Sequence, residues 1–388
     1  MLLVAALQCH SDTDGPNDFS THVYDCAFEP DTENPGSFTN LVATAGGDKI
    51  CFIDVSTKKV MMSYREMRKY NNKCEFFYSI DWSVTESQSK TKSITRLCAG
   101  GLHGDVKIMY PSMNICPVVF EVSKLQISVL KHHPKRQNIL FTGSDDKYVR
   151  LWYIPDLEAI EVSNKETSSK PFCTSKIKLP NSDDFLTCFE FLVNRNIILI
   201  GTEENFYACK LVDTKSELSL STNFLINIKW KSSKIALPLK IDSIAVMKND
   251  IIGLLTFGSE FAHLCKLYGD FNKSISLQVI RALECNHRKS RYTHIFYSSV
   301  NSTLITGSDD GSIFMHKQLD LDQKPTGVVR PVDVIIEWPN CFTMNGEHRQ
   351  NLDKLPKLIK CISNGQMLVS VTDCNLVLIW QLENDSPK

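Results

Sequence analysis

Hydrophobic and polar positions alternate along this chain in short runs, and the clearest pattern lies at residues 138–152, NILFTGSDDKYVRLW. An apolar run at residues 139–141 is followed by Gly143, Ser144 and two aspartates, and apolar residues then return as far as Trp152. Apolar runs separated by turn-forming residues are typical of two antiparallel strands with a tight connection. The pattern therefore predicts a β-hairpin.

The same hairpin pattern returns, less regularly, at residues 41–54, 96–110, 197–211, 304–316 and 368–380. A spacing of roughly 40 to 60 residues is close to the period of propeller blades. One turn position is polar in all six hairpins, where it holds Asp48, His103, Asp146, Glu204, Asp310 and Asp373. Such side chains can hydrogen-bond the turn backbone, so their repetition indicates a structural role rather than a catalytic one.

The repeats predict seven blades in one all-β domain spanning residues 1–388. The expected blades cover residues 22–64, 74–122, 125 onward, 185–230, 237–283, 292–338 and 355–380. Two polar segments, residues 83–93 and 164–184, are expected to be surface loops.

The last predicted blade supplies only three strands, whereas the apolar residues 2–8 have no blade of their own. We therefore predict that residues 2–8 pair with residues 375–380. This pairing would close a seven-bladed WD-repeat β-propeller and hide its sheet edges.

Composition fits a large folded domain, with 388 residues, 43% hydrophobic and 22% charged. A net charge of −1 provides no overall basic field for a phosphate backbone, so the sequence does not support direct DNA binding. The apolar start, residues 1–9, is too short to span a bilayer and lacks the basic beginning of a signal peptide. We therefore expect a strand there, no membrane association and an intracellular location.

Fourteen cysteines are scattered singly through the chain. Several, including Cys26, Cys51, Cys98, Cys188 and Cys209, fall in apolar strand patterns where a reduced, buried thiol fits. Without a C-x-x-C pair, a zinc site has no local support, and we expect no metal and no cofactor.

Enzyme motifs are missing from the sequence, which contains no G-x-S-x-G, H-E-x-x-H, G-x-G-x-x-G or Walker motif. The pair His132-His133 could bind a metal or transfer protons. Its place at the end of a predicted inner strand favours a structural role instead. We therefore expect a protein that is not an enzyme and has no catalytic residues.

Several segments, taken in order, resemble one family of propellers: LQCHS at residues 7–11, CAFEP at 26–30, EFFYSIDW at 75–82 and VTDCNLVLIW at 371–380. They are similar to the propeller of the leucine-rich-repeat and WD-repeat proteins that associate with the origin recognition complex. The resemblance implies a nuclear chromatin scaffold at pericentric heterochromatin, which supports replication initiation and heterochromatin organisation. The implied partners are origin recognition complex subunits, methylated histone tails carrying repressive marks and other chromatin proteins. That family carries leucine-rich repeats before its propeller, so we expect a fragment or a short form.

A more distant similarity, to the propeller subunit of Polycomb repressive complexes, implies an aromatic cage for trimethyl-lysine. The candidate cage residues are Tyr24, Tyr78 and Tyr292. Each stands four residues before an aromatic residue of its predicted inner strand, namely Phe28, Trp82 and Phe296. Our alignment places non-aromatic residues at the same position of the other blades: Ser128, Thr187, Asp242 and Leu358.

Aromatic faces attract a trimethylammonium group by about 0.5 to 2 kcal/mol each, and this group cannot donate hydrogen bonds. The structural alternative is that these tyrosines simply pack at strand starts with their hydroxyls in water. Two functions remain open at this point, a chromatin-binding scaffold and a generic intracellular propeller adaptor such as a ubiquitin-ligase substrate receptor. The fold alone does not choose between them.

Overall fold

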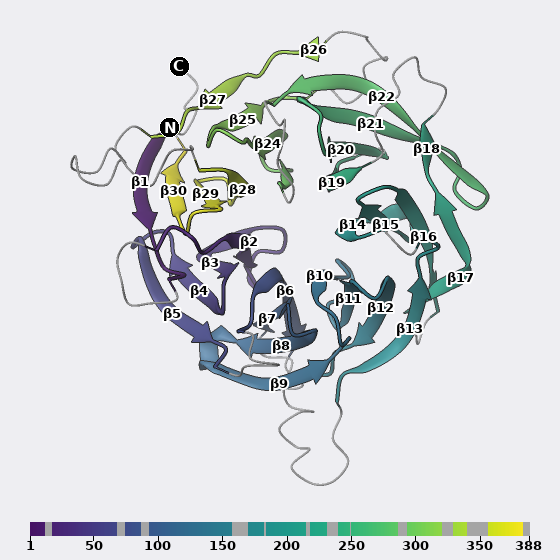
Figure 1. Ribbon diagram of the computed structural model, residues 1–388, viewed down its shortest axis with the longest axis horizontal. Helices are drawn as coiled ribbons and strands as arrows, with labels where there is room; N and C mark the ends of the chain where they lie inside the picture. The colour runs from purple at the N-terminus through teal and green to yellow at the C-terminus, as the bar shows by residue number, and fades with distance from the viewer. Residues whose placement is uncertain are drawn as a thin grey trace.

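The computed structural model describes residues 1–11, 18–67, 74–86, 93–156, 170–181, 184–214, 218–230, 240–248, 250–285, 293–319, 329–339 and 356–382. Regular structure in these residues is β-strand except for two short 3-10 turns, η1 (Pro111–Met113) and η3 (Val193–Arg195). The strands form seven sheets arranged as a ring (Figure 1). The predicted seven-bladed β-propeller is confirmed. Within the described part of the chain, no helix has the length and apolar character needed to cross a membrane.

The first four blades each contain four antiparallel strands. Blade one contains β2 (Val23–Pro30), β3 (Phe38–Gly46), β4 (Lys49–Asp54) and β5 (Lys59–Arg65). Blade two contains β6 (Phe77–Glu86), β7 (Ser93–Gly101), β8 (Asp105–Tyr110) and β9 (Ile115–Glu121). Blade three contains β10 (Ile127–His132), β11 (Ile139–Ser144), β12 (Tyr148–Tyr153) and β13 (Phe172–Lys178). Blade four contains β14 (Leu186–Leu192), β15 (Ile197–Thr202), β16 (Phe206–Asp213) and β17 (Leu218–Asn227).

The remaining blades complete the ring. Blade five contains β19 (Ile241–Val246), β20 (Ile251–Thr256), β21 (Phe261–Asp270) and β22 (Ser274–Glu284). Two short strands, β18 (Lys229–Trp230) and β26 (Val329–Arg330), run parallel to β22. Blade six contains β23 (Ile295–Ser298), β24 (Thr303–Gly307), β25 (Ile313–His316) and β27 (Val334–Ile336). Blade seven contains β28 (Leu358–Ser363), β29 (Met367–Thr372), β30 (Val377–Gln381) and β1 (Leu2–Leu7).

Both ends of the described chain meet in blade seven. Strand β1 pairs antiparallel with β30, with Leu3 opposite Trp380 and Leu7 opposite Val377. Figure 1 shows the purple β1 beside the yellow β30. The predicted closure by the N-terminal strand is therefore confirmed.

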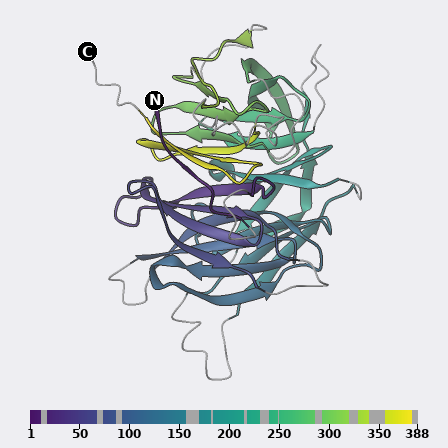
Figure 2. The ribbon, with the colours of Figure 1, turned by 60° about the vertical axis from the view of Figure 1, so that its left-hand side comes forward.

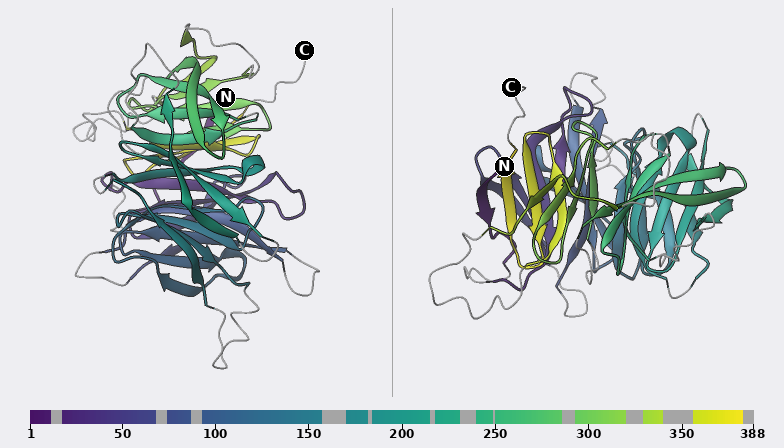
Figure 3. Two further views of the ribbon diagram at one scale, coloured as in Figure 1. Left: turned by 90° about the vertical axis from the view of Figure 1, so that its right-hand side faces the viewer. Right: turned by 90° about the horizontal axis from the view of Figure 1, so that it is seen from above.

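Apolar side chains fill the space between neighbouring blades rather than one central core. Phe141 and Leu151 of blade three, for example, belong to the same buried cluster as Phe189 and Ile200 of blade four. The rotated views show the sheets packed face to face (Figures 2 and 3). Because an interior strand of a blade packs on both faces, its residues read as apolar runs rather than as a strict alternation.

Three predicted boundaries differ from the structure. Residues 83–86 were expected in a loop, but they extend β6, and Glu86 pairs with Ser93 of β7. Two polar side chains in this extension have hydrogen-bond partners, since Arg96 Nε donates to Ser83 Oγ at 2.9 Å and Thr85 Oγ1 donates to the Ile94 carbonyl at 3.2 Å. The rest of the expected loop, residues 87–92, lies outside the described residues.

The second difference is β13, which lies inside residues 164–184, the other segment that was expected to be a loop. Ile177 is the one buried residue of this strand, so its apolar signal is weak. The third difference concerns Trp230, which was expected to end blade four. It pairs with Leu277 of blade five instead.

Candidate functional site

The inner strands of the blades are arranged around the centre of the ring (Figure 1). Their side chains line a cavity of about 610 Å³. These strands are β2, β6, β10, β14, β19, β23 and β28. Residues from all seven of them line the cavity. We call the end of the cavity at which these strands begin the strand-start end.

Tyr24 and Tyr78 lie together at the strand-start end. Their ring centroids are 4.9 Å apart and their planes are inclined by 81°, which is an edge-to-face arrangement. Each tyrosine stands at a β-bulge, where the pairing register shifts between Val23 and Asp25 and between Phe77 and Ser79. A bulge redirects its side chain out of the regular alternation. The structure thus brings two of the three candidate cage residues into contact, from neighbouring blades.

The third candidate, Tyr292, lies outside the described residues. The strand pairing of blade six nevertheless shows that the alignment of Tyr292 with Tyr24 and Tyr78 is shifted by one residue. The turn residues Asp310 of blade six and His103 of blade two hold the same position, so the pairing can be counted from them. Four residues before Asp310, Thr306 pairs with Ile295. Four residues before His103, Ala99 pairs with Ile80. Tyr78 stands two residues before Ile80, and Thr293 stands two residues before Ile295. Thr293 is therefore the residue of blade six that corresponds to Tyr78.

The alignment of blade seven is also shifted by one residue. Tyr24 and Tyr78 stand at the register shifts of their strands, and in β28 the residue at the register shift is Ile359 rather than Leu358. In blade six the error arose because two aromatic residues are adjacent. Tyr297 pairs with Leu304, which makes it the equivalent of Phe28 and Trp82. The sequence alignment places Phe296 at that position instead. The cage itself remains a prediction.

Acidic side chains outnumber basic ones along the cavity. Six carboxylates line it, from Asp25, Asp81, Asp145, Glu190, Glu203 and Asp242, whereas two lysines do so, Lys131 and Lys360. His294 adds no charge at neutral pH because burial lowers its pKa to about 4. Such a lining favours a cationic ligand over an anionic one.

The two lysines that line the cavity are each held by a carboxylate. Lys360 Nζ lies 2.6 Å from Asp25 Oδ1, and Lys131 contacts Glu190. Three acidic residues instead come from segments at the strand-start end, namely Asp145, Glu203 and Asp242. Burial raises the pKa of Asp145, and Ser128 Oγ donates to its carboxylate at 2.8 Å. Negative charge therefore gathers at the same end as the tyrosine pair.

Polar inner-strand residues also join neighbouring blades. Asp25 Oδ2 accepts from the Ile80 backbone amide at 2.8 Å, and Ser79 Oγ accepts from the Leu130 amide at 3.1 Å. Asp242 Oδ2 likewise accepts from the Thr293 amide at 3.0 Å. These contacts fix the inner strands relative to one another and thereby position the residues that line the cavity.

Sequence reasoning missed Phe185, which also lines the cavity and is 42% exposed. Lys147 Nζ lies 3.4 Å from the centroid of its ring. The signal was weak because Phe185 stands one residue before β14, outside the inner-strand pattern used for alignment.

The pair His132-His133 has a structural role, as predicted. His132 Nδ1 lies 3.1 Å from Asp81 Oδ2, and the backbone amide of His132 donates to the same oxygen. His133 Nδ1 accepts from the Arg136 amide at 3.0 Å. Burial lowers the pKa of both imidazoles, which keeps them neutral.

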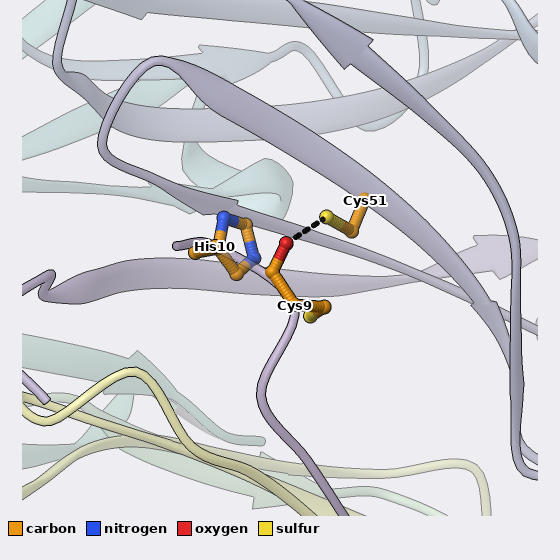
Figure 4. Close-up of side chains that lie close together, drawn as sticks. All are labelled: Cys9, His10 and Cys51. Atoms are coloured by element: carbon orange, nitrogen blue, oxygen red, sulfur yellow. Dashed lines mark hydrogen bonds between the residues drawn. The ribbon is translucent and has the colours of Figure 1, made fainter. Parts of the chain in front are cut away.

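A second cluster of chemically active side chains lies away from the cavity, where Cys9 and His10 meet Cys51 (Figure 4). Their candidate ligand atoms all lie within 4.8 Å of one another. Among the residues that the structure describes, this is the cluster suited to holding a metal ion.

Comparison with known proteins connects this propeller to one family. The model of the family described as leucine-rich repeat and WD repeat-containing protein 1, WD domain, matches residues 2–382. The chain belongs to this family. Among its relatives, leucine-rich repeat and WD repeat-containing protein 1 of Xenopus tropicalis is 28% identical over 97% of this chain and 54% of its own length. The protein of the same name from Homo sapiens is 23% identical over 96% of this chain and 57% of its own length. The chain thus spans about half the length of the relatives it matches.

Solved structures with a similar fold include chains of Polycomb repressive complex 2. A chain of the Chaetomium thermophilum complex has a TM-score of 0.70 and 13% identity, covering 98% of this chain and 97% of that one. A chain of ctPRC2 in complex with H3K27me3 has a TM-score of 0.70 and 12% identity, with the same coverage. At this identity the likeness concerns the fold alone. Family and fold together identify a WD-repeat scaffold.

Proposed function

We propose that this propeller is a non-enzymatic chromatin-binding scaffold that docks methylated histone tails at the strand-start end of its cavity. The observation that carries the proposal is the edge-to-face pair of Tyr24 and Tyr78 beside an acidic lining. The fold neighbour in complex with H3K27me3 supports the same class of ligand.

The chemistry of the site suits a trimethylated lysine. Each suitable aromatic face contributes about 0.5 to 2 kcal/mol to binding a cation, and trimethylammonium loses little hydration when it is buried. Two faces would therefore favour a trimethylated over an unmodified lysine on the order of tenfold or more. Asp145, Glu203 and Asp242 add attraction for the basic residues of a histone tail.

Fluorescence anisotropy with trimethylated and unmodified histone peptides tests this proposal. We expect Tyr78→Ala to weaken binding of the trimethylated peptide about tenfold and to affect the unmodified peptide far less. Tyr78→Phe keeps the aromatic face and should bind nearly normally. Tyr297→Ala is a matched control, because Tyr297 is the blade-six equivalent of Trp82. That position lies four residues, or roughly 13 Å, along the inner strand from the position of Tyr78.

Equal affinity of the unmutated protein for both peptides would contradict the reader function. Tyr292→Ala, measured in the same assay, tests the third cage position, which the sequence alignment suggested and the strand register assigns to Thr293. A selective loss with Tyr292→Ala would support the original three-tyrosine cage.

We further propose, from family membership, that the chain contacts origin recognition complex subunits and acts in the nucleus at pericentric heterochromatin. Residues 1–388 should then co-purify those subunits and nucleosomes with repressive marks, and a fluorescent fusion should concentrate at heterochromatin. A folded propeller that captures neither, but captures ubiquitin-ligase components, would instead indicate an adaptor.

A further inference from the structure

The cluster of Cys9, His10 and Cys51 lies where the ring closes. Cys9 and His10 stand two and three residues after the end of β1, the closing strand, and Cys51 lies in β4 of blade one. His10 is fully buried and Cys51 is 1% exposed. Figure 4 shows the His10 imidazole, the Cys51 sulfur and the Cys9 carbonyl oxygen around one small space, with the Cys9 side chain beside it.

The hydrogen bonds of His10 set its tautomer. Its Nδ1 lies 3.0 Å from the carbonyl oxygen of Gly46, which can only accept, so Nδ1 carries the proton. The lone pair is therefore on Nε2, the nitrogen that faces the cysteines (Figure 4). Metal-binding histidines have this arrangement, in which the second ring nitrogen donates to a backbone carbonyl.

Thr44 provides the present partner of that lone pair, with its Oγ1 2.9 Å from His10 Nε2. The same hydroxyl has a second acceptor, the carbonyl of Cys51, at 3.5 Å. A metal ion can therefore take Nε2 without leaving the threonine hydroxyl unsatisfied. The backbone amide of His10 donates to Asn375 Oδ1 at 2.8 Å, which holds the residue in place.

The Cys51 side chain is also oriented for coordination. The Cys51 thiol donates to the carbonyl oxygen of Cys9 at 3.3 Å, so its sulfur already points to this space. Thiolates, not thiols, are the ligands that metals bind.

We propose that Cys9, His10 and Cys51 bind one Zn²⁺ ion. Two thiolates and one imidazole are a ligand set that zinc prefers, and a fourth ligand would complete the tetrahedron. Around tetrahedral zinc such ligand atoms lie roughly 3.5 to 3.8 Å apart, given bonds of about 2.3 Å to sulfur and 2.0–2.1 Å to nitrogen. The present separations, within 4.8 Å, require only a small inward shift.

The ion would fasten the end of the closing strand to blade one. Because the ligands come together only in the closed ring, zinc would bind the folded protein and not the unfolded chain, and would stabilise it by mass action. A zinc concentration well above the dissociation constant should therefore raise the melting temperature by a few degrees.

Cobalt provides a direct optical test, because Co²⁺ occupies zinc sites and thiolate ligands give it a near-ultraviolet charge-transfer band. The folded protein is reduced with a phosphine, freed of metal with a chelator and titrated with Co²⁺ and then Zn²⁺. We expect one equivalent of Co²⁺ to produce the band and Zn²⁺ to displace it. Cys9→Ser and Cys51→Ser should each lower the affinity at least tenfold, whereas the exposed control Cys173→Ser should not.

Failure of the reduced, unmutated protein to develop the band would overturn the metal site, whether or not the variants fold. Retention of the band at full strength in a folded Cys51→Ser variant would overturn it as well. A disulfide between Cys9 and Cys51 is the alternative. It is indicated if no band develops, if the protein kept without reductant is two hydrogen masses lighter than the reduced protein, and if mass spectrometry finds both cysteines in one cross-linked peptide.

Discussion

At the residue scale, Asp25 joins three blades through one carboxylate. It is 5% exposed, its Oδ1 lies 2.6 Å from Lys360 Nζ of blade seven, and its Oδ2 accepts from the Ile80 amide of blade two. Burial by itself would lower the pKa of Lys360, but Asp25 raises it above its ordinary value. The lysine therefore stays charged, and its partner is needed to keep it so.

We expect Asp25→Ala to lower the free energy of unfolding by about 3–5 kcal/mol, since it leaves a largely buried ammonium and a buried amide without this partner. Urea unfolding monitored by tryptophan fluorescence measures the change. The exposed pair of Asp270 and Lys273, 4.0 Å apart, provides the control, and Asp270→Ala should change stability by less than about 0.5 kcal/mol. A similar small loss for both variants would contradict the inter-blade role of Asp25.

At the scale of a single element, the turn between β11 and β12 shows why one polar position recurs in the repeats. Asp146 Oδ1 accepts from the Tyr148 amide at 3.1 Å and from Arg150 Nη1 at 3.0 Å. Asp310 does the same for the Ser312 amide at 3.0 Å in the turn of blade six. The predicted structural role of this position is confirmed at these two turns. Burial of Asp146 would raise its pKa, but hydrogen bonds from Arg150 and Ser144 lower it to about 2.

A lowered pKa means that ionised Asp146 stabilises the fold above pH 4 and that this contribution disappears as the pH falls towards 2. We expect Asp146→Asn to cost about 2 kcal/mol at pH 7, with about half of that difference gone at pH 3. Urea unfolding over this range measures it. The neighbouring Asp145 has a raised pKa, so Asp145→Asn should not destabilise the protein at pH 7. A cost for Asp146→Asn that does not change with pH would contradict the assignment.

At the scale of the whole molecule, stability depends on closing the ring. Strand β1 covers the edge of β30, and its side chains Leu3, Val4 and Leu7 pack against buried clusters of blade seven and its neighbours. An uncovered edge would expose unpaired backbone groups and apolar surface together. The first ten residues therefore contribute to the fold out of proportion to their number.

Removing residues 1–10 should lower the melting temperature by several degrees, because the lost burial is worth on the order of several kcal/mol. Circular dichroism on heating measures it. Removal of residues 383–388, which follow β30, is the control and should have little effect. An unchanged melting temperature after the N-terminal deletion would refute the stabilising role of the closing strand.

The sequence by itself determined the number of blades, the hairpins and the closing pair of strands. Apolar periodicity and turn chemistry are local, and the six hairpins that share them confirm one another. Strand β13 was missed because an outer strand with one buried residue carries little apolar signal. Residues 83–86 were missed because Ser83 and Thr85 are buried with hydrogen-bond partners that spacing cannot reveal.

Contacts between residues of different blades were decided by the tertiary structure alone. Sequence spacing suggested Tyr24 and Tyr78, but their edge-to-face contact depends on bulges in two separate blades. The register of blade six, which replaces Tyr292 by Thr293, could be read only from strand pairing. Cys9 and Cys51 meet because β1 closes the ring and leads the chain directly onto blade one. Closure brings together residues that no local pattern relates, since the position of each blade depends on all the others.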